Sequence, residues 1–378
     1  MTSFRTVADK ARAAYENKSA GKKANAAYTC VYTPIEVLGA ANVSYMRFMH
    51  KGTQEELIAG EGLTQSMLCD LTKSIVGGFM KQTPMYVATD RLYTFNTCGC
   101  MRNSVEAIKS TYCDAEIFNL PRRKNDSSGL EYLTSEIKAF KENLEELTGE
   151  EIPENEIRRC VRSFNQAKKL LREIAEFRKG PAPLITSSEF QELTHALFYV
   201  PVEELIPELE KIKIQLKQKP KPHKRKIRLM LAGGDISVGD NKVTKILEQD
   251  MGTSIVVEDN CSGMKPISTD INDKAENIYE AIAEGYLNKA PCGRMYPIED
   301  MLQYSLKLAQ EYDVDGVVLY YLKFCPCYSM IEKNYAELFR EHNIPLIILS
   351  GDYSVGDEGQ MKTRLEAFVE MLQERRDS

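Results

Sequence analysis

The sequence predicts an α/β protein in which two parallel-sheet domains are connected through a helical segment. Short apolar runs typical of buried strands alternate with helical periods in the first and the last third of the chain. The central third is long, charged and helical in period, and a stretch rich in proline and lysine follows it. We therefore expect two Rossmann- or flavodoxin-like domains, a helical cap and a linker, at residues 1–128, 227–378, 129–217 and 218–226 respectively.

The first domain is predicted from a series of strand-like runs and the helices between them. Pro34 is well placed to begin a helix, because an amide hydrogen at the first helical position would have no hydrogen-bond partner within the helix. Strands are expected at residues 27–33, 43–49, 85–90, 92–96 and 115–120. Helices are expected at residues 2–20, from 35 onward, at 65–79 and at 104–110.

The central segment has the pattern of a long amphipathic helix. Ile137, Phe140, Leu144 and Leu147 recur at helical spacing and would form one apolar face. Little strand character follows as far as the linker, so we expect a helical insertion or cap. The linker, QKPKPHKRK, combines prolines with like charges that discourage packing. A solvated hinge is therefore expected there in preference to a patch that binds phosphate or nucleic acid.

The second domain is predicted to begin at Ile227, where the apolar run IRLMLA precedes a glycine pair. Such a pair after a strand can approach a phosphate, but a plain turn is its commoner role. Strands are expected at residues 227–232, 254–258, 316–322 and 344–349. Helices are expected at residues 242–249, 275–283, 298–312, 331–342 and 361–373.

The composition is that of a globular protein and argues against several classes of function. The 378 residues are 43% hydrophobic and carry a net charge of −6, which disfavours nucleic acid as the main partner. No apolar run approaches the roughly 20 residues of a membrane helix, and the N-terminus lacks the apolar core of a signal peptide. We therefore expect a cytoplasmic protein. Its ten cysteines would be reduced there, so clustered ones favour metal binding or catalysis over disulfides.

Seven cysteines are placed to reach one region of this fold. Three predicted strands end in thiols, and parallel sheets bind their ligands at that end. The pairs Cys98/Cys100 and Cys325/Cys327 have one intervening residue and lie in opposite halves of the chain, unlike the pairs of a zinc site. Soft thiolates suit an iron–sulfur cluster better. The candidate ligands are Cys69, Cys98, Cys100, Cys261, Cys292, Cys325 and Cys327.

The alternative for any cysteine is a small buried hydrophobic side chain. Cys30, in an apolar strand-like run, Cys113, before a strand, and Cys160, on the helical cap, are expected to be structural in this sense. Candidate neighbours of the metal are Asp70, Asn96, Arg294, Lys323 and Tyr328. The two cations among them would offset the charge of thiolates and sulfides, or else be solvated surface groups.

Motifs along most of the chain resemble those of one enzyme family. They are Cys30-Val-Tyr-Thr-Pro34-Ile-Glu36, Met67-Leu-Cys69, Thr97-Cys98, Leu322-Lys-Phe-Cys325 and the helical run 363–370, TRLEAFVE. This set resembles the 2-hydroxyacyl-CoA dehydratase and benzoyl-CoA reductase family. In its dehydratase subunits, three cysteines at such positions hold one [4Fe-4S] cluster and leave one iron open to the substrate thioester.

Two further motifs resemble another branch of that family, the double-cubane cluster proteins. They contain Cys261 in Glu258-Asp-Asn-Cys-Ser-Gly263 and Cys292 in Ala290-Pro-Cys. In that branch two [4Fe-4S] units share a bridging sulfide in an [8Fe-9S] cluster, with three cysteines for each cubane. Together with Cys69, Cys98 and Cys325 these make five ligands, and Cys100 or Cys327 would be the sixth. Dehydratase subunits have an acidic residue after the last cysteine, where this chain has Pro326-Cys327, so the double-cubane branch is favoured.

This resemblance implies a reductase that works at low potential on a small-molecule substrate. Its electrons would come from a separate ATP-hydrolysing iron–sulfur activator, and the chain would form a homodimer or pair with a homologous subunit. Two alternatives stay open. One is the [4Fe-4S] subunit of a 2-hydroxyacyl-CoA dehydratase, which removes water from an acyl-CoA thioester by radical elimination. The other is a non-catalytic cluster carrier.

Overall fold

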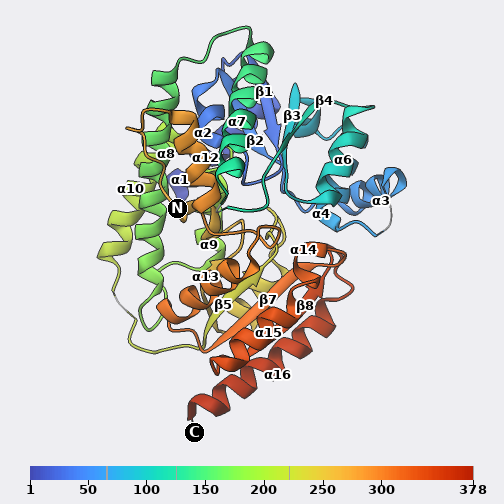
Figure 1. Cartoon of the computed structure of the whole chain (residues 1–378). Helices are drawn as coiled ribbons and strands as arrows, with labels where there is room; N and C mark the ends of the chain where they lie inside the picture. The colour runs from blue at the N-terminus through green and yellow to red at the C-terminus, as the bar shows by residue number, and fades with distance from the viewer. Residues whose placement is uncertain (65–66, 125, 221, 378) are drawn as a thin grey trace.

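The computed structural model describes residues 1–64, 67–124, 126–220 and 222–377. In this part of the chain the strands form two separate four-stranded sheets, in which all neighbouring strands are parallel. Figure 1 shows one sheet in each half of the molecule, with helices packed around both. The predicted α/β fold with two parallel-sheet units is confirmed.

The first sheet has the strand order β2-β1-β3-β4. Its strands are β1 (Ala24–Tyr28), β2 (Val43–Arg47), β3 (Arg91–Asn96) and β4 (Asp114–Asn119). The helices of this part of the chain are α1 (Thr2–Glu16), α2 (Ile35–Ala40), α3 (Gln54–Leu63), α4 (Asp70–Met80), α5 (Pro84–Val87) and α6 (Gly99–Lys109). Because β1 has β2 on one side and β3 on the other, the direction of winding reverses between β1 and β3.

The second sheet repeats this arrangement with the order β6-β5-β7-β8. Its strands are β5 (Arg228–Gly233), β6 (Ser254–Asp259), β7 (Gly316–Leu322) and β8 (Leu346–Gly351). The longer helices here are α12 (Ile278–Asn288), α13 (Ile298–Glu311), α15 (Glu332–Glu341) and α16 (Glu358–Asp377). Short helical turns are α11 (Lys242–Thr244), η2 (Lys245–Asp250), η3 (Lys265–Ile267) and α14 (Pro326–Ser329). The corresponding reversal lies between β5 and β7.

The central segment is helical, as its periodicity predicts. It contains α7 (Ser127–Thr148), α8 (Glu154–Ala175), η1 (Glu176–Arg178), α9 (Ser187–Ala196) and α10 (Val202–Gln218). Three of the four predicted face residues, Ile137, Phe140 and Leu144, are fully buried. Helices α8 and α10 run along one flank, from the level of the first sheet towards the second (Figure 1).

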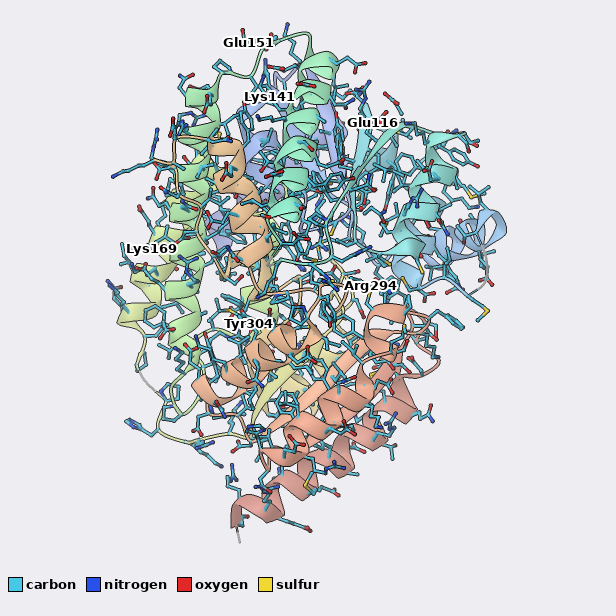
Figure 2. All side chains as sticks on the ribbon, viewed as in Figure 1. Glu116, Lys141, Glu151, Lys169, Arg294 and Tyr304 are labelled. Carbon is cyan, nitrogen blue, oxygen red and sulfur yellow. The ribbon has the colours of Figure 1, made fainter. Side chains whose placement is uncertain are left out.

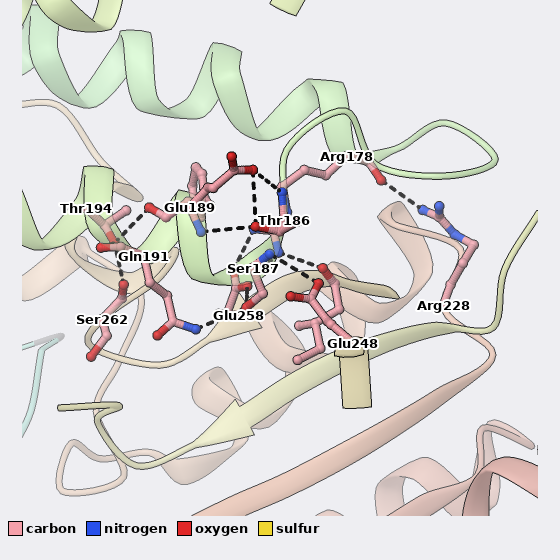
Figure 3. A network of polar contacts seen from close by, with 12 residues as sticks. Arg178, Thr186, Ser187, Glu189, Gln191, Thr194, Arg228, Glu248, Glu258 and Ser262 are labelled. Carbon is pink, nitrogen blue, oxygen red and sulfur yellow. Dashed lines mark hydrogen bonds and ion pairs between the residues drawn. The ribbon is translucent and has the colours of Figure 1, made fainter. Parts of the chain in front are cut away.

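A buried ion pair fastens this helical segment to the second sheet. Arg178, at the end of η1, forms two 2.5 Å hydrogen bonds with the carboxylate of Glu258 in β6, and neither side chain is exposed. The guanidinium also lies 4.7 Å from the ring centroid of Phe190. Ser187, the first residue of α9, donates to the same carboxylate, as Figure 3 shows. The end of α8, the start of α9 and β6 are therefore held together by one polar network.

Three predicted elements differ in the structure. Residues 84–87 form α5 and not a strand, because Pro84 occupies the first helical turn and Tyr86 packs on Phe48 and Phe79 from one helical face. The first strand covers residues 24–28 and not 27–33, since the chain turns ahead of α2. Of the predicted helix 65–79, residues 65 and 66 lie outside the described residues, and α4 begins only at Asp70.

The boundaries at residues 128/129, 217/218 and 226/227 stay predictions. Residue 221 of the linker lies outside the described residues. One large core cluster contains buried side chains from both sheets and from the helical segment, so the parts share a hydrophobic core. We expect limited proteolysis to cut first within 218–226 if this stretch is the hinge. No helix within the described ranges is long and apolar enough to span a membrane.

Candidate metal centre

A cavity of about 130 Å³ lies where the carboxyl ends of the two sheets meet. Its walls include the segments that follow β1, β3, β5, β6 and β7, so residues distant in sequence face one another across it. Ligands of parallel sheets bind at this edge, near the strands where the winding reverses. Seven of its lining residues are cysteines: Cys30, Cys69, Cys98, Cys261, Cys292, Cys325 and Cys327.

The first half of the chain supplies three of these thiols. Cys30 follows β1 and Cys98 follows β3, each by two residues, and these strands are neighbours in the sheet. Cys98 and Cys69 occupy the N-terminal capping positions of α6 and α4. A helix N-terminus carries partial positive charge, which favours a thiolate over a thiol. Their placement therefore suits anionic sulfur ligands.

The second half supplies the other four thiols. Cys261 stands two residues after β6, and Cys325 stands three residues after β7. Phe324 has φ +62°, a left-handed conformation that turns the chain between β7 and the short helix α14, which carries Cys327. Cys292 lies in the connection between α12 and α13. Separate loops and turns thus bring sulfur to the same cavity from this side.

Cys327 connects thiols from different segments. The thiols of Cys292, Cys325 and Cys98 all act on its pKa, which is raised above the usual value for a thiol. The Nε of Arg294 donates to its sulfur over 3.0 Å. In Figure 2, Arg294 lies at the level where the two sheet units meet. Hydrogen bonds from Cys100 and from Cys327 lower the pKa of Cys98, so one thiolate in this group is stabilised by neighbouring S–H donors.

Cys30, Cys261 and Cys292 form the other part of the thiol set. Burial raises the pKa of the Cys30 and Cys261 thiols. The pKa of Cys292 is raised by its hydrogen bond with Cys327 and by burial. All three line the same cavity, and the charge of Cys292 acts on the pKa of both of the others. Because a buried anion is costly without a nearby cation, ionising these thiols requires a positive partner in the cavity.

Arg47 is a buried cation in the cavity wall, and it links the two sheets. Its side chain is 2% exposed and forms an ion pair with Asp235, which follows β5. It also donates to the carbonyl of Cys261 over 3.1 Å. Ser262 donates to the other oxygen of Asp235 over 3.0 Å. The end of β2 is therefore tied to the loops after β5 and β6, and this contact positions Cys261.

The seven thiols suit a cluster better than a single metal ion. Among the described residues, no group of three or more His, Cys, Asp or Glu side chains is arranged to hold one ion. The cysteines instead surround a cavity with volume of its own. In an iron–sulfur cluster the protein thiolates bind different irons, so the ligands are spread around the cluster's surface. The soft donor set and its spread both fit such a group.

A family model described as 2-hydroxyglutaryl-CoA dehydratase, D-component, matches residues 30–372. The chain belongs to this family. Its relatives include YjiM of Escherichia coli (strain K12), a provisionally named dehydratase subunit, which is 27% identical over 353 residues, 91% of this chain and 90% of its own. The (R)-phenyllactyl-CoA dehydratase beta subunit of Clostridium sporogenes is 22% identical, with 90% of each chain covered. A benzoyl-CoA reductase subunit of Thauera aromatica is 27% identical over 47% of this chain and 46% of its own. The family resemblance drawn from the cysteine motifs is confirmed.

In this member of the dehydratase family, most of the predicted ligands do line one cavity. Cys100 is absent from its described wall, although it contacts Cys98. Cys160 is buried in the hydrophobic core, and Cys113 donates to the backbone carbonyls of Thr89 and Asp114, in agreement with structural roles. Among the predicted neighbours, Tyr328 lines the cavity and Arg294 contacts a thiol.

Lys323 and Asn96 are occupied elsewhere. Lys323 forms a partly exposed ion pair with Asp352, and Asn96 donates to Asn119 at the surface. Asp70 accepts a hydrogen bond from the backbone of Tyr353. These side chains stabilise loops around the cavity and are not part of its described wall.

Sequence reasoning missed two residues of this site. Cys30 was expected to be structural because its strand-like run hides the end of β1 at Tyr28. Its place in the motif that opens the family match was the signal that could have found it. Arg47 has no sequence signal of its own, because its partner Asp235 is distant in the chain.

Proposed function

We propose that this chain is an iron–sulfur subunit that reduces a small molecule by one-electron steps at low potential. The observation that carries the proposal is the convergence of seven thiols, from both halves of the chain, on one cavity. When bound, the cluster would supply electrons at a potential that the surrounding protein tunes. An ATP-hydrolysing iron–sulfur activator would deliver those electrons, as the family resemblance implies.

An [8Fe-9S] double-cubane cluster agrees best with the number and grouping of the thiols. One [4Fe-4S] cluster with an open iron needs three cysteines, whereas the cavity has seven. Cys69, Cys98 and Cys325 would hold one cubane. Cys261 and Cys292 would hold the second, and its third ligand would be Cys30 or Cys327. Cys100 is the weaker candidate for this position, because the described cavity wall does not include it.

The chain's own residues would hold this group, shield it from water and balance its charge. The N-termini of α4 and α6 place positive charge at the cavity, beside thiolates that are negative. Arg47, whose charge is balanced by Asp235, holds the backbone of Cys261 in position. Arg294 donates to Cys327 and lowers the electron density on that sulfur. Tyr328 and Leu322 contribute buried apolar surface that restricts water.

The second candidate function is that of a dehydratase subunit with a single [4Fe-4S] cluster. It is favoured by the names of relatives, two of which are dehydratase beta subunits. A non-catalytic cluster carrier is the third. Since these relatives are named as subunits, we propose that this chain also assembles, either with a homologous subunit or as a homodimer. The substrate would be a small molecule in the first case and an acyl-CoA thioester in the second.

Iron and sulfide analysis of protein purified without oxygen tests these assignments. About eight irons per chain would agree with the double cubane, and about four with the dehydratase subunit. Replacing Cys261 or Cys292 by Ser should remove about half of the iron in the first case. Matched controls are Cys113→Ser and Cys160→Ser, which should keep all of it.

Full iron retention in the Cys261 and Cys292 variants, with about four irons in the wild type, would reject the double cubane. A wild-type protein without iron and sulfide would reject the proposed function altogether. Catalysis with the activator and ATP distinguishes either enzyme from a carrier.

A further inference from the structure

Lys289 differs from the other buried lysines of the described chain in having no carboxylate partner. Four buried lysines each form an ion pair, with partners Asp70 and Glu61, Glu36, Asp357 and Asp259; they are Lys73, Lys168, Lys242 and Lys265. Lys289 is only 5% exposed, yet no carboxylate of the described residues is in ion-pair contact with it. A buried ammonium of this kind is expensive unless an anion lies nearby.

The contacts that Lys289 does make are neutral. Its Nζ donates to the carbonyl of Val31 and lies 3.7 Å from the ring centroid of Tyr32 and 4.9 Å from that of Tyr286. The residue also occupies the C-terminal capping position of α12, where the helix dipole favours a cation. The nearby carboxylate of Glu36 is already bonded to Lys168 and Tyr286. These contacts hold the ammonium in place but leave its charge unbalanced.

Lys289 lies beside the thiol cavity. Val31, which accepts its hydrogen bond, is part of the cavity wall. Burial lowers the pKa of Lys289 to about 8, and the thiols of Cys30, Cys261 and Cys292 act against this decrease, as negative groups near an ammonium do. The anion that balances the ammonium of Lys289 is thus expected on the side of the cavity that these three cysteines line.

We propose that Lys289 is the counter-ion of the anionic group on the side of the cavity that Cys30, Cys261 and Cys292 line. This inference rests on the proposed function, because it assigns the anion to the cluster and its thiolates. In reduction, one electron from a donor adds one negative charge to the cavity, and a fixed cation stabilises that reduced form. Lys289 is therefore a positioning residue that raises the reduction potential of the cluster. It would not contact the substrate.

The test is a redox titration of iron-loaded protein with titanium(III) citrate, which gives up one electron as it becomes titanium(IV). The variants are Lys289→Met, which removes the charge and keeps the length, and Lys289→Arg, which keeps the charge. We expect Lys289→Met to disfavour reduction at least tenfold, about 59 mV for a one-electron couple. Lys289→Arg should stay near the wild type.

Thermal unfolding of the iron-free proteins gives a second readout. There Lys289 is a buried cation without a counter-ion, so Lys289→Met should be at least as stable as the wild type. Lys168→Met is the matched control and should be less stable, because it leaves the buried carboxylate of Glu36 unpaired. A lysine that only tethers the loop would instead give a Lys289→Met variant that is destabilised like this control.

The potential decides between the outcomes. If the equilibrium constant for reduction changes less than tenfold in an iron-loaded Lys289→Met protein, the inference is overturned and the proposed function still stands. If Lys289→Met takes up no cluster, uptake by Lys289→Arg supports the counter-ion role, and failure of both variants overturns it. A wild type that binds no iron removes the proposed function and this inference together.

Discussion

Replacing Arg178 by Met should destabilise the protein strongly at the strand that presents Cys261. The change leaves the carboxylate of Glu258 fully buried with Ser187 as its remaining hydroxyl donor. Removing one partner of a buried ion pair costs about 3–5 kcal/mol, because the other charge stays desolvated. We expect a loss in this range, to which the lost contact with the ring of Phe190 also contributes.

Arg172→Met is the matched control for this variant. Arg172 lies one turn and a half earlier on α8 and pairs with Asp270, but its side chain is 28% exposed and that of Asp270 is 50% exposed. Exposed pairs contribute about 1 kcal/mol or less, so this variant should be close to the wild type. A double variant, Arg178→Met with Glu258→Leu, should recover part of the loss, because it removes both buried charges.

Urea unfolding of the iron-free variants measures the free energies, and amide hydrogen exchange of β6 locates the change. Arg178→Met should accelerate exchange in β6 (Ser254–Asp259), since the strand loses the contact that fastens it to the helical segment. In the loaded protein we expect lower iron content, because Cys261 follows this strand. A loss below about 1 kcal/mol in Arg178→Met, no larger than in Arg172→Met, would refute the reasoning.

Three further predictions concern other parts of the fold. Arg47→Met should lower the free energy of unfolding by about 3 kcal/mol and speed alkylation of Cys261 by iodoacetamide, because it breaks the buried link between the sheets. An unchanged rate of labelling would contradict this. Burial raises the pKa of Asp240 to about 6, so its ionised form destabilises the folded protein above pH 6 and has no such effect below about pH 4. Asp240→Asn should therefore stabilise the protein by about 2–3 kcal/mol at pH 8 and leave its stability unchanged at pH 4, which urea denaturation at both pH values measures. Gly233→Ala should lower the free energy of unfolding by more than about 3 kcal/mol, because φ is +118° and a Cβ would overlap the carbonyl oxygen of Tyr320 in β7. Gly149→Ala, whose Cβ would lie in open space, should lower it by about 1 kcal/mol, and equal urea midpoints for the two variants would contradict this.

The fold class and most ligands were accessible from sequence because they depend on local patterns. Buried strands are short apolar runs, and a cysteine directly after such a run must lie at the carboxyl end of a parallel sheet. Cys98, Cys261 and Cys325 follow this rule and do line the cavity. Local patterns do not distinguish a helix from a strand where the helix is very short. Residues 84–87 show this, because a single helical turn is too short to display the helical repeat.

The tertiary structure decided which side chains face one another. The sequence pattern places Cys30 inside a strand, but β1 ends at Tyr28 and the following turn exposes the thiol to the cavity. Lys323, in contrast, is a candidate neighbour of the metal by sequence position, and an ion pair with Asp352 holds it elsewhere. Sequence spacing specifies where the chain leaves a strand, but not the direction in which the following turn points each side chain.

The amino-acid sequence by itself determined the two parallel sheets, the helical segment and the concentration of thiols at strand ends. Only the tertiary structure decided that two of these edges meet, that Arg47 bridges them, and that Lys289 is buried with no carboxylate of the described residues paired to it. The physical reason is that secondary structure and its edges follow from short-range periodicity and turn chemistry. Charge balance in a buried site instead depends on groups that are far apart in the sequence and become neighbours only after the chain has folded.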